Sequence, residues 1–448
     1  MYFVVIAGFA LGVFSTSVKF GVTGFASSVL GTLGMTLLPP AAAAAVMLYC
    51  SARTRRAASD EVERAHALFI LATRYLNVTR ALEGIVLAAY AVSLYVFSWS
   101  AMPERAHVER WALPSGALVT APFIVSLVLL WIPMHYTESC LRSSHPTLRQ
   151  RLSFNVRQYL LTLAVPVATI LGFFDGVSFL PASVTKPFSN PVAQAALGGV
   201  VVLGGYTVAP LVVVRLWKTT HLPDSPMRER LTALCARIGV AFRDIRVWET
   251  PGHYFVNAAV MGVAGFVRYI VVSRTLLEVM PISQVEGVFA HELGHAKRHH
   301  MPYYLLFAGD FILLVYIMDG ATGADLASGI VYAAISAVLF ALWWGLGFGY
   351  VSRAFERDAD LFSAEVEGDH RVFSEALVTI AKFNGVSPSA RSWRHGSIRS
   401  RVEFLDAAAA MPEVRSRFIR RIQFLKALVA AIFVLSVAAI LVLEHMGY

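Results

Sequence analysis

Long apolar stretches are the feature that most limits what this chain can fold into. A helix needs roughly 20 apolar residues to cross a bilayer, and about nine stretches approach that length. Hydrophobic residues make up 57% of the 448 residues and charged residues only 15%, unlike an ordinary soluble enzyme. We therefore expect a polytopic α-helical membrane protein with spans near residues 2–18, 25–49, 82–100, 115–135, 158–180, 193–215, 303–320, 327–350 and 425–443.

The loops between these stretches carry a signal of orientation. Four of them are rich in arginine, and successive members of this group are separated by two predicted spans, so all four lie on one side of the membrane. The positive-inside rule makes that side the cytoplasm. The formal net charge of +9 then fits loops beside anionic lipid, and we expect a lipid bilayer but no nucleic acid as a partner. The four loops are residues 51–66, 141–157, 216–301 and 351–424.

The segment from residue 217 onward changes character. "SPMRERLTALCARIGV" has the pattern of an amphipathic helix, and "IRVWET", "YFVNAAVMG" and "RYIVVSRTL" read as short strands. These features predict a small α+β, zincin-like catalytic unit on the cytoplasmic face. We divide the chain into an N-terminal multi-span region (1–216), a catalytic unit (217–301), a transmembrane hairpin (302–350), a second catalytic helical region (351–424) and a C-terminal span (425–448).

A five-residue motif, "HELGH", follows the predicted strands. Ser283 and Glu286 match a capping box, so we expect a helix to begin there. On that helix His291 and His295 are four residues apart and share one face, which can present two imidazoles to one zinc ion. Glu292 lies beside that face. The alternative interpretation is a helix end near the membrane surface that carries solvated histidines.

A catalytic zinc ion needs a third protein ligand and an open fourth position. "YVSRAFERDADLFSAE" supplies a candidate, because Glu356 and Asp360 are four residues apart and share a helical face. Glu356 can bind the metal, and Asp360 can accept a hydrogen bond from the second ring nitrogen of a ligating histidine. The alternative is an exposed helix on which Arg353 and Arg357 pair with these acids. Two intervening spans would return the chain to the same membrane face.

In combination, four motifs resemble the membrane-embedded gluzincins, which include the CAAX prenyl proteases and the HtpX heat-shock proteases. The resemblance covers roughly residues 217 to 410, and the motifs stand in the family's order. The matching stretches are "NAAVMG" (257–262), "GVFAHELGHAKRHH" (287–300), "SRAFERDAD" (352–360) and "WRHGSIRSRVEFL" (393–405).

The resemblance assigns a role to each residue of the metal site. It implies that His291, His295 and Glu356 bind one Zn²⁺ ion per chain. It also implies Glu292 as the general base and Asp360 as the partner of a ligand. Zinc lowers the pKa of its bound water towards 7, so Glu292 would take a proton as that water attacks a peptide carbonyl.

Substrate contacts are implied in the same way. His395 and Arg401 match the family's downstream histidine and arginine, either of which can stabilise an oxyanion. Asn257, Ala258 and Ala259 would lie on an edge strand that pairs with an extended peptide or membrane-protein substrate. The chain departs from many relatives at Ala259, where they carry an aromatic residue, and at Gly396, where they often carry a proline.

Other functions remain open at this stage. An intramembrane-cleaving zinc protease places this motif inside a span, whereas here the polar run 297–300 follows it and favours the membrane surface. A transporter or scaffold with a vestigial metal site is a different class, and the intact Glu292 argues against it. Within the protease class, CAAX-type prenyl-protein processing and quality control of membrane proteins are both possible, and the sequence does not indicate an oligomeric state.

Overall fold

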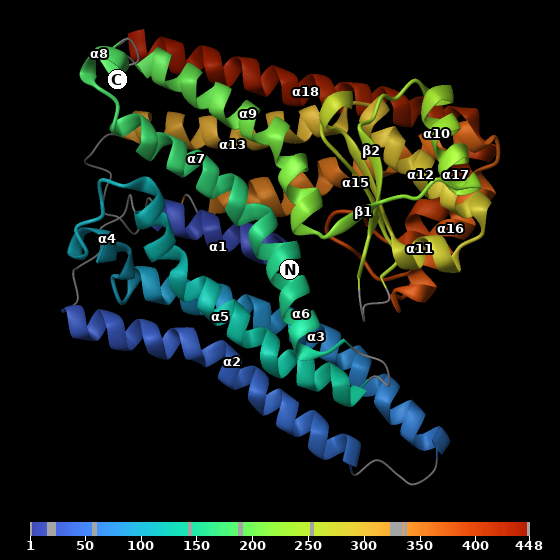
Figure 1. Ribbon diagram of the computed structural model, residues 1–448, viewed down its shortest axis with the longest axis horizontal. Helices are drawn as coiled ribbons and strands as arrows, with labels where there is room; N and C mark the ends of the chain where they lie inside the picture. The colour runs from blue at the N-terminus through green and yellow to red at the C-terminus, as the bar shows by residue number, and fades with distance from the viewer. Residues whose placement is uncertain are drawn as a thin grey trace. The chain divides into compact units, whose positions relative to one another are not determined.

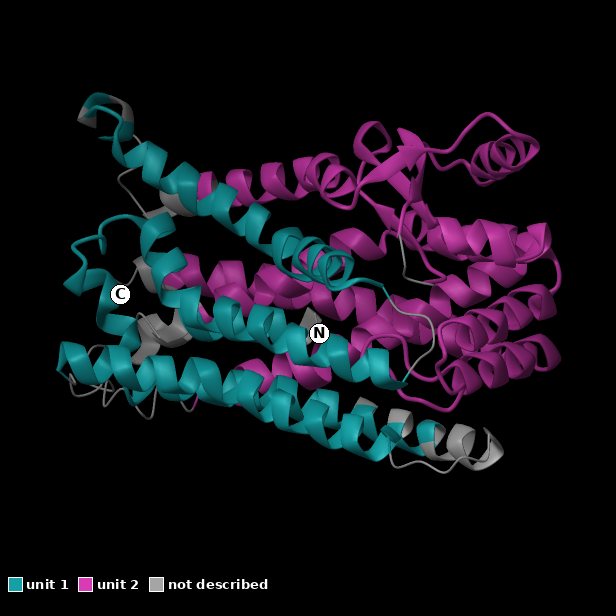
Figure 2. Cartoon of the chain, turned by 60° about the horizontal axis from the view of Figure 1, so that its bottom comes forward, with its two compact units in different colours: residues 1–186, 251–253, 327–333 teal, residues 187–250, 254–326, 334–448 magenta. Residues whose placement is uncertain are grey.

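The computed structural model describes residues 2–15, 24–55, 61–141, 146–186, 191–250, 255–322, 335 and 338–445. The chain forms two compact units, drawn in different colours in Figure 2. We call residues 1–186, with 251–253 and 327–333, the N-terminal unit, and residues 187–250, 254–326 and 334–448 the C-terminal unit. Residues 193–215, which belong to the predicted N-terminal membrane region, lie in the C-terminal unit, where Tyr206 donates a hydrogen bond to the Met301 carbonyl at 3.4 Å.

The N-terminal unit is made of helices. Helix α5 packs against α1, α2 and α3, and its Phe123, Leu127 and Trp131 side chains are at most 1% exposed. Burial of these large apolar groups supplies the unit's own core. The elements are α1 (Tyr2–Ser15), α2 (Phe25–Arg55), α3 (Glu61–Tyr95), η1 (Trp99–Ala101), α4 (Met102–Arg105), α5 (Ala112–Leu141), α6 (Leu148–Asn155), the π-helix η2 (Val156–Leu161), α7 (Thr162–Ser178) and α8 (Ala182–Thr185).

The C-terminal unit combines a four-stranded sheet with helices (Figure 1). The strand order is β1-β2-β4-β3, in which β2 and β4 are parallel and the two outer pairs are antiparallel. The strands are β1 (Thr219–His221), β2 (Asp244–Trp248), β3 (Ala258–Met261) and β4 (Tyr269–Ser273). The helices are α9 (Pro191–Leu216), α10 (Pro226–Ile238), η4 (Gly265–Val267), α11 (Arg274–Val279), α12 (Ile282–Lys297), α13 (His300–Thr322), the π-helix η6 (Ala341–Phe348), α15 (Gly349–Glu367), α16 (His370–Phe383), α17 (Ile398–Ala410) and α18 (Pro412–His445).

Local sequence signals explain the start of this unit. The predicted amphipathic helix is α10: Ser225 caps it by accepting a hydrogen bond from the Arg228 backbone, and Gly239 ends it at a φ of 72°. The three predicted strands are β2, β4 and β3. Strand β1, which is only three residues long and pairs with β2, was not predicted from the sequence. Strand β3 lies at an edge of the sheet, as expected.

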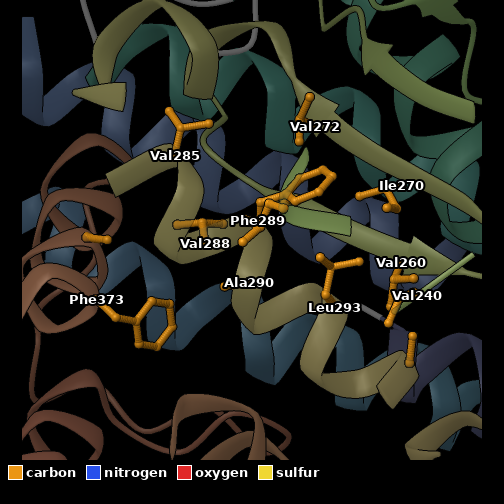
Figure 3. Packing of buried hydrophobic residues seen from close by; sticks show 14 of the residues in the cluster. Val240, Val260, Ile270, Val272, Val285, Val288, Phe289, Ala290, Leu293 and Phe373 are labelled. Carbon is orange, nitrogen blue, oxygen red and sulfur yellow. The ribbon is translucent and has the colours of Figure 1, made fainter. Parts of the chain in front are cut away.

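Helix α12 lies within the hydrophobic core of this unit. Val285, Phe289 and Leu293 are fully buried in the cluster that also contains Val260 and Ile270 of the sheet (Figure 3). This packing fixes one face of the helix against the sheet, so the helix presents a different face to α15 and α16.

The predicted capping box at the start of α12 is wrong. The helix begins at Ile282 with Pro281 as its N-cap, and no side chain caps it. The Glu286 carboxylate instead accepts two hydrogen bonds from Arg230 of α10, each of 2.8 Å. The proline ring fixes φ at the N-cap, where Pro281 has a φ of −57°, but it supplies no side-chain acceptor in place of the expected serine.

A glycine allows α12 and α15 to approach closely. A Cβ atom at Gly294 would lie 3.0 Å from the Phe362 ring and 3.3 Å from the Ala359 Cα atom. Elsewhere on the same helix a Cβ at Gly287 would make only ordinary contacts of 3.7–3.8 Å with Phe373. The short distance between these helices at Gly294 therefore depends on the missing side chain.

Seven helices in the described part of the chain are long and apolar enough to cross a membrane. Each overlaps one of the predicted spans, which supports a polytopic integral membrane protein. The two other predicted spans fall on α1, of which 14 residues are described, and on α13, whose apolar part is residues 300–315, so nine spans are not confirmed. The seven are Phe25–Arg55, Asn77–Tyr95, Ala112–Leu141, Leu148–Ser178, Leu197–Leu216, Val338–Glu367 and Pro412–Val442.

The contrast between the two glycines can be tested by replacing each of them with alanine. Gly287→Ala should raise the melting temperature of the purified protein or leave it unchanged, because alanine favours a helix over glycine by about 1 kcal/mol. Gly294→Ala should lower it relative to Gly287→Ala, because its Cβ must displace Phe362 or the α15 backbone. Equal melting temperatures would contradict the close approach.

Candidate metal centre

Two histidines and one glutamate from separate helices converge in the C-terminal unit. His291 and His295 of α12 and Glu356 of α15 are 6%, 7% and 3% exposed. Their ligand atoms all lie within 4.8 Å of one another. The four-residue spacing places both imidazoles on one face of α12, and the same face receives α15. The structure thus brings together all three residues that the sequence predicted as metal ligands.

The distances fit a zinc ion. The Nε2 atoms of His291 and His295 are 3.3 Å apart, and they lie 3.6 Å and 3.7 Å from the two carboxylate oxygens of Glu356. Tetrahedral ligands with bonds of about 2.05 Å to zinc are separated by about 3.3 Å. The two imidazole nitrogens and the Glu356 carboxylate, at nearly this spacing, could together hold a zinc ion with one position left for a substrate.

Glu292 is held by the edge strand of the sheet. One carboxylate oxygen of Glu292 accepts a hydrogen bond from the Val260 backbone at 3.0 Å. Burial raises the pKa of Glu292 to about 7, although the neighbouring His291 opposes this shift. A carboxylate with a pKa near the operating pH is suited to take up and return a proton.

Asp360 occupies the place expected for the partner of a ligand. It is fully buried, and its Oδ1 atom lies 3.0 Å from Nδ1 of His291. The Arg401 guanidinium binds both oxygens of Asp360, and its Nη1 atom lies 3.4 Å from Glu356. Arg401 is 7% exposed. The structure therefore places Arg401 behind the ligands, bound to Asp360, and not on an exposed surface.

The pKa values of the two histidines move in opposite directions. Burial alone would lower the pKa of His291, but the Asp360 and Glu356 carboxylates raise it to about 9. Burial lowers the pKa of His295 well below its ordinary value, and Glu356 opposes this only in part. His295 thus offers a neutral ring, whereas a metal ion must displace a proton to bind His291 at neutral pH.

His395 lies at the open side of the cluster. Its side chain is 49% exposed, and its Nδ1 atom is 2.9 Å from Oε1 of Glu356. The loop that carries it is a tight turn closed by two backbone hydrogen bonds between Ser392 and Gly396, of 2.9 and 3.0 Å. Gly396 has a φ of 73°, a conformation that proline cannot adopt, which accounts for glycine at this departure from the family pattern.

In the predicted substrate strand, some residues direct their backbone groups to β4 and others direct them to the outer edge of the sheet. The Asn257 carbonyl accepts a hydrogen bond from Ser273 of β4 at 2.9 Å, and the Asn257 N–H donates to the Ser273 hydroxyl at 3.0 Å. Backbone directions alternate along a strand, so Ala259 also faces β4, whereas Ala258 and Val260 direct their N–H and C=O groups to the outer edge. Of the three residues predicted to contact substrate, only Ala258 has its backbone turned outward.

Three polar residues near the metal ligands were not identified from sequence. His300 was grouped with a polar run at the membrane surface, but it is fully buried and lies 2.9 Å from His295. Asp358 is 5% exposed, and Lys426 lies 3.4 Å from it. The interpretation of His300 as a surface residue is therefore wrong. A break in the helix at His299, which has a φ of 58°, turns the chain back so that His300 faces inward.

Comparison with known proteins finds similarity to membrane metalloproteases. Residues 223–426 match the family model described as peptidase family M48. The chain is 24% identical over 247 residues to a protein named protease HtpX homolog from Janthinobacterium sp. (strain Marseille), covering 52% of this chain and 78% of that protein. It is 24% identical over 193 residues to CAAX prenyl protease 1 homolog of Arabidopsis thaliana, covering 40% of this chain and 45% of that protein, which is less than half of its length.

The fold also resembles a solved structure. The crystal structure of S. mikatae Ste24p matches with a TM-score of 0.53 and 17% sequence identity, over 83% of this chain and 99% of that one. This likeness concerns the fold, and it extends beyond the roughly 190 residues over which the sequence motifs are recognisable. The expected resemblance to membrane-embedded metalloproteases is confirmed.

The ligand set makes a direct prediction about metal content. The purified protein should hold about one zinc ion per chain, and His291→Ala or Glu356→Ala should lose it, since two remaining ligands hold zinc weakly. His299→Asn is the matched control, because His299 is exposed and asparagine tolerates its backbone conformation. Metal analysis after dialysis checks this, and full zinc content in both ligand variants would refute the assignment.

Proposed function

We propose that this chain, whose residues 223–426 match the model of peptidase family M48, is an integral-membrane zinc metalloendopeptidase. Its substrates would be membrane-associated peptides or membrane proteins. The observation that carries the proposal is the convergence of His291, His295 and Glu356 in one cluster, with Glu292 on α12 between the two histidines.

The residues of the site divide the chemistry between them. Zinc, when bound, supplies Lewis acidity and lowers the pKa of the water that it activates. Glu292 would take the proton from that water and later return it to the leaving amine. Its hydrogen bond from Val260 fixes the carboxylate while leaving its other oxygen for the proton. Positioned proton transfer of this kind typically contributes about 10²–10⁴-fold to a rate.

Strand β3 would hold the substrate. Ala258 directs its backbone groups to the edge of the sheet, so an extended peptide can add there as a further strand. The next outward-facing residue, Val260, contacts Glu292, so a peptide bound along this edge runs past the general base. Backbone pairing of this kind selects substrates for their extended conformation more than for their side chains.

His395 is the stronger candidate of the two predicted oxyanion donors. It is half exposed and next to Glu356, whereas the Arg401 guanidinium is buried and binds both oxygens of Asp360. One well-placed donor is worth about 2.7–4 kcal/mol in other enzymes. Arg401 would act on the metal site through Asp360, and His395 would contact the substrate.

The two named relatives differ in role, because one name refers to an HtpX protease and the other to a CAAX prenyl protease. Quality control of membrane proteins and prenyl-protein processing share the hydrolysis of a peptide bond beside a membrane. The proposal therefore extends to that reaction class, and a comparison of membrane proteins in cells with and without active enzyme would identify the substrates.

Glu292→Gln separates the chemistry from the structure. Glutamine keeps the size of the side chain and an oxygen that can accept the Val260 hydrogen bond, but it cannot take up a proton. The variant should remain folded and zinc-loaded and should lose at least about 10²-fold in peptidase activity.

Near-normal proteolysis by Glu292→Gln would show that the α12 helix is not the active site. A wild-type protein that binds zinc but cleaves no peptide or membrane protein would favour the vestigial-site alternative. Zinc content measured on the same preparations distinguishes the two results.

The cytoplasmic orientation of the site is a separate proposal that rests on the arginine-rich loops. Ala390→Cys places a thiol in an exposed loop of the catalytic region, and Glu109→Cys places one in an exposed loop predicted on the other side. A membrane-impermeant maleimide should label Glu109→Cys in intact cells and Ala390→Cys only after permeabilisation. The reverse pattern would overturn the predicted topology.

A further inference from the structure

The outer ring nitrogen of His295 begins a row of buried polar contacts. Its Nδ1 atom lies 2.9 Å from Nδ1 of His300, and Nε2 of His300 lies 3.0 Å from Oδ2 of Asp358. Lys426 donates a hydrogen bond of 3.4 Å to the same carboxylate oxygen. The four side chains come from α12, α13, α15 and α18, so the row connects a metal ligand to three other helices.

Asp358 determines which ring nitrogens of His300 and His295 carry a proton. A carboxylate only accepts hydrogen bonds, so His300 must carry its proton on Nε2 to donate to Asp358. Neutral His300 then has a lone pair on Nδ1, which accepts a hydrogen bond from the Nδ1–H group of His295. This leaves the lone pair of His295 on Nε2, the atom that faces Glu356. The row thus selects the tautomer of His295 that can bind zinc.

The members of the row are held firmly in place. The His300 ring stacks on Phe355 with centroids 4.3 Å apart and planes 6° apart, and both side chains are fully buried. Lys426 also donates a hydrogen bond of 2.9 Å to the Arg298 carbonyl at the end of α12. These contacts fix the plane of the His300 ring. They therefore also fix the direction of the hydrogen bond between Nδ1 of His300 and Nδ1 of His295.

Helix geometry explains why His295 needs an intermediate residue. Glu356 and Asp360 are four residues apart and share a face of α15, so Asp360 reaches His291 directly. Asp358 is two residues from each and points to a different side of the helix, where it meets His300. Each ligand histidine is therefore supported by an acid that is paired with a cation, Arg401 in one case and Lys426 in the other.

We propose that His300, Asp358 and Lys426 are positioning residues that set the tautomer and orientation of His295 for zinc. This inference rests on the metal site of the proposed function and extends it to residues outside that site. Loss of such a partner typically weakens metal binding by about 10–100-fold.

The first experiment replaces His300 in two ways in the full-length, detergent-solubilised protein. His300→Phe keeps the stacking on Phe355 but removes both nitrogens, and it should raise the zinc dissociation constant by about 10–100-fold in a chelator competition. His300→Asn can present an amide oxygen where Nδ1 lay, so it should bind zinc more tightly than His300→Phe. The visible spectrum of the cobalt-substituted protein should shift more in His300→Phe than in His300→Asn, because it reports ligand geometry.

The second experiment tests the far end of the row with a matched pair of variants. Asp358→Asn removes a charge that contacts no metal ligand, and it should weaken zinc binding by about tenfold. Glu365→Gln removes a charge from the same helix that pairs with Arg298 but has no contact with His300, and it should leave zinc binding unchanged. A role in packing alone would lower the melting temperature without changing the dissociation constant of the folded protein.

Zinc dissociation constants within about twofold of the wild type in His300→Phe and Asp358→Asn would overturn the proposal, because partners of metal ligands contribute more than this. If His300→Phe does not fold, Asp358→Asn against Glu365→Gln decides the question, since both preserve side-chain size. Failure of the wild-type protein itself to bind zinc would remove the proposed function along with this inference. Tight zinc binding by the wild type and both variants would remove only the inference.

Discussion

The close packing of α12 on α15 is the constraint on which the metal site depends. Two ligands lie on one helix and the third on the other, and α13 and η6 separate these helices in the chain. The Glu356 oxygens of α15 lie 3.6–3.7 Å from the imidazole nitrogens of α12, and the missing side chain at Gly294 lets the two helices approach closely beside this cluster. The apolar burial of Phe289 and Leu293 on the neighbouring face of α12 supplies free energy to hold the helix there.

Buried charge is the second constraint on the site. Glu356, Asp358 and Asp360 are all at most 5% exposed and occupy little more than one turn of α15. Burying three carboxylates is costly unless each has a cationic or hydrogen-bonded partner. Arg401 and Lys426 bind the two aspartates. The Glu356 oxygens face the two imidazoles, His395 and, at 3.4 Å, the Arg401 guanidinium. The donor set thus favours a divalent metal ion for electrostatic as well as geometric reasons.

Sequence reasoning succeeded where a short pattern determines the geometry by itself. The four-residue spacings of His291 with His295 and of Glu356 with Asp360 each fix a shared helical face, and the structure shows both pairs as expected. Sequence reasoning failed where packing between segments distant in the chain determines which residues are buried. Nothing local distinguishes the buried His300 from the exposed His299, because the difference depends on a turn between two helices and on Asp358 across the interface.

The difference between local sequence patterns and tertiary packing also explains the mistaken capping box and the missed strand β1. Ser283 and Glu286 match the pattern, but Arg230 of another helix takes the Glu286 carboxylate, so the local preference is overridden. Strand β1 is too short to show alternation, and its pairing with β2 depends on a contact distant in sequence. Apolar length predicted the seven long apolar helices of the described residues, because hydrocarbon thickness, and not a specific partner, sets that length.

The site combines rigid ligands with a substrate loop that is anchored from a distance. His395 lies on a three-residue turn, and the neighbouring Trp393 indole donates a hydrogen bond of 2.8 Å to the Gly345 carbonyl of the π-helix η6. A Cβ at Gly349 would lie 2.8 Å from the same indole, so glycine is needed for Trp393 to reach this place. Because η6 continues directly into α15, one continuous helical segment supports Glu356 and also anchors the loop that carries His395. Movement of that segment would therefore displace Glu356 and His395 together, which keeps their spacing constant.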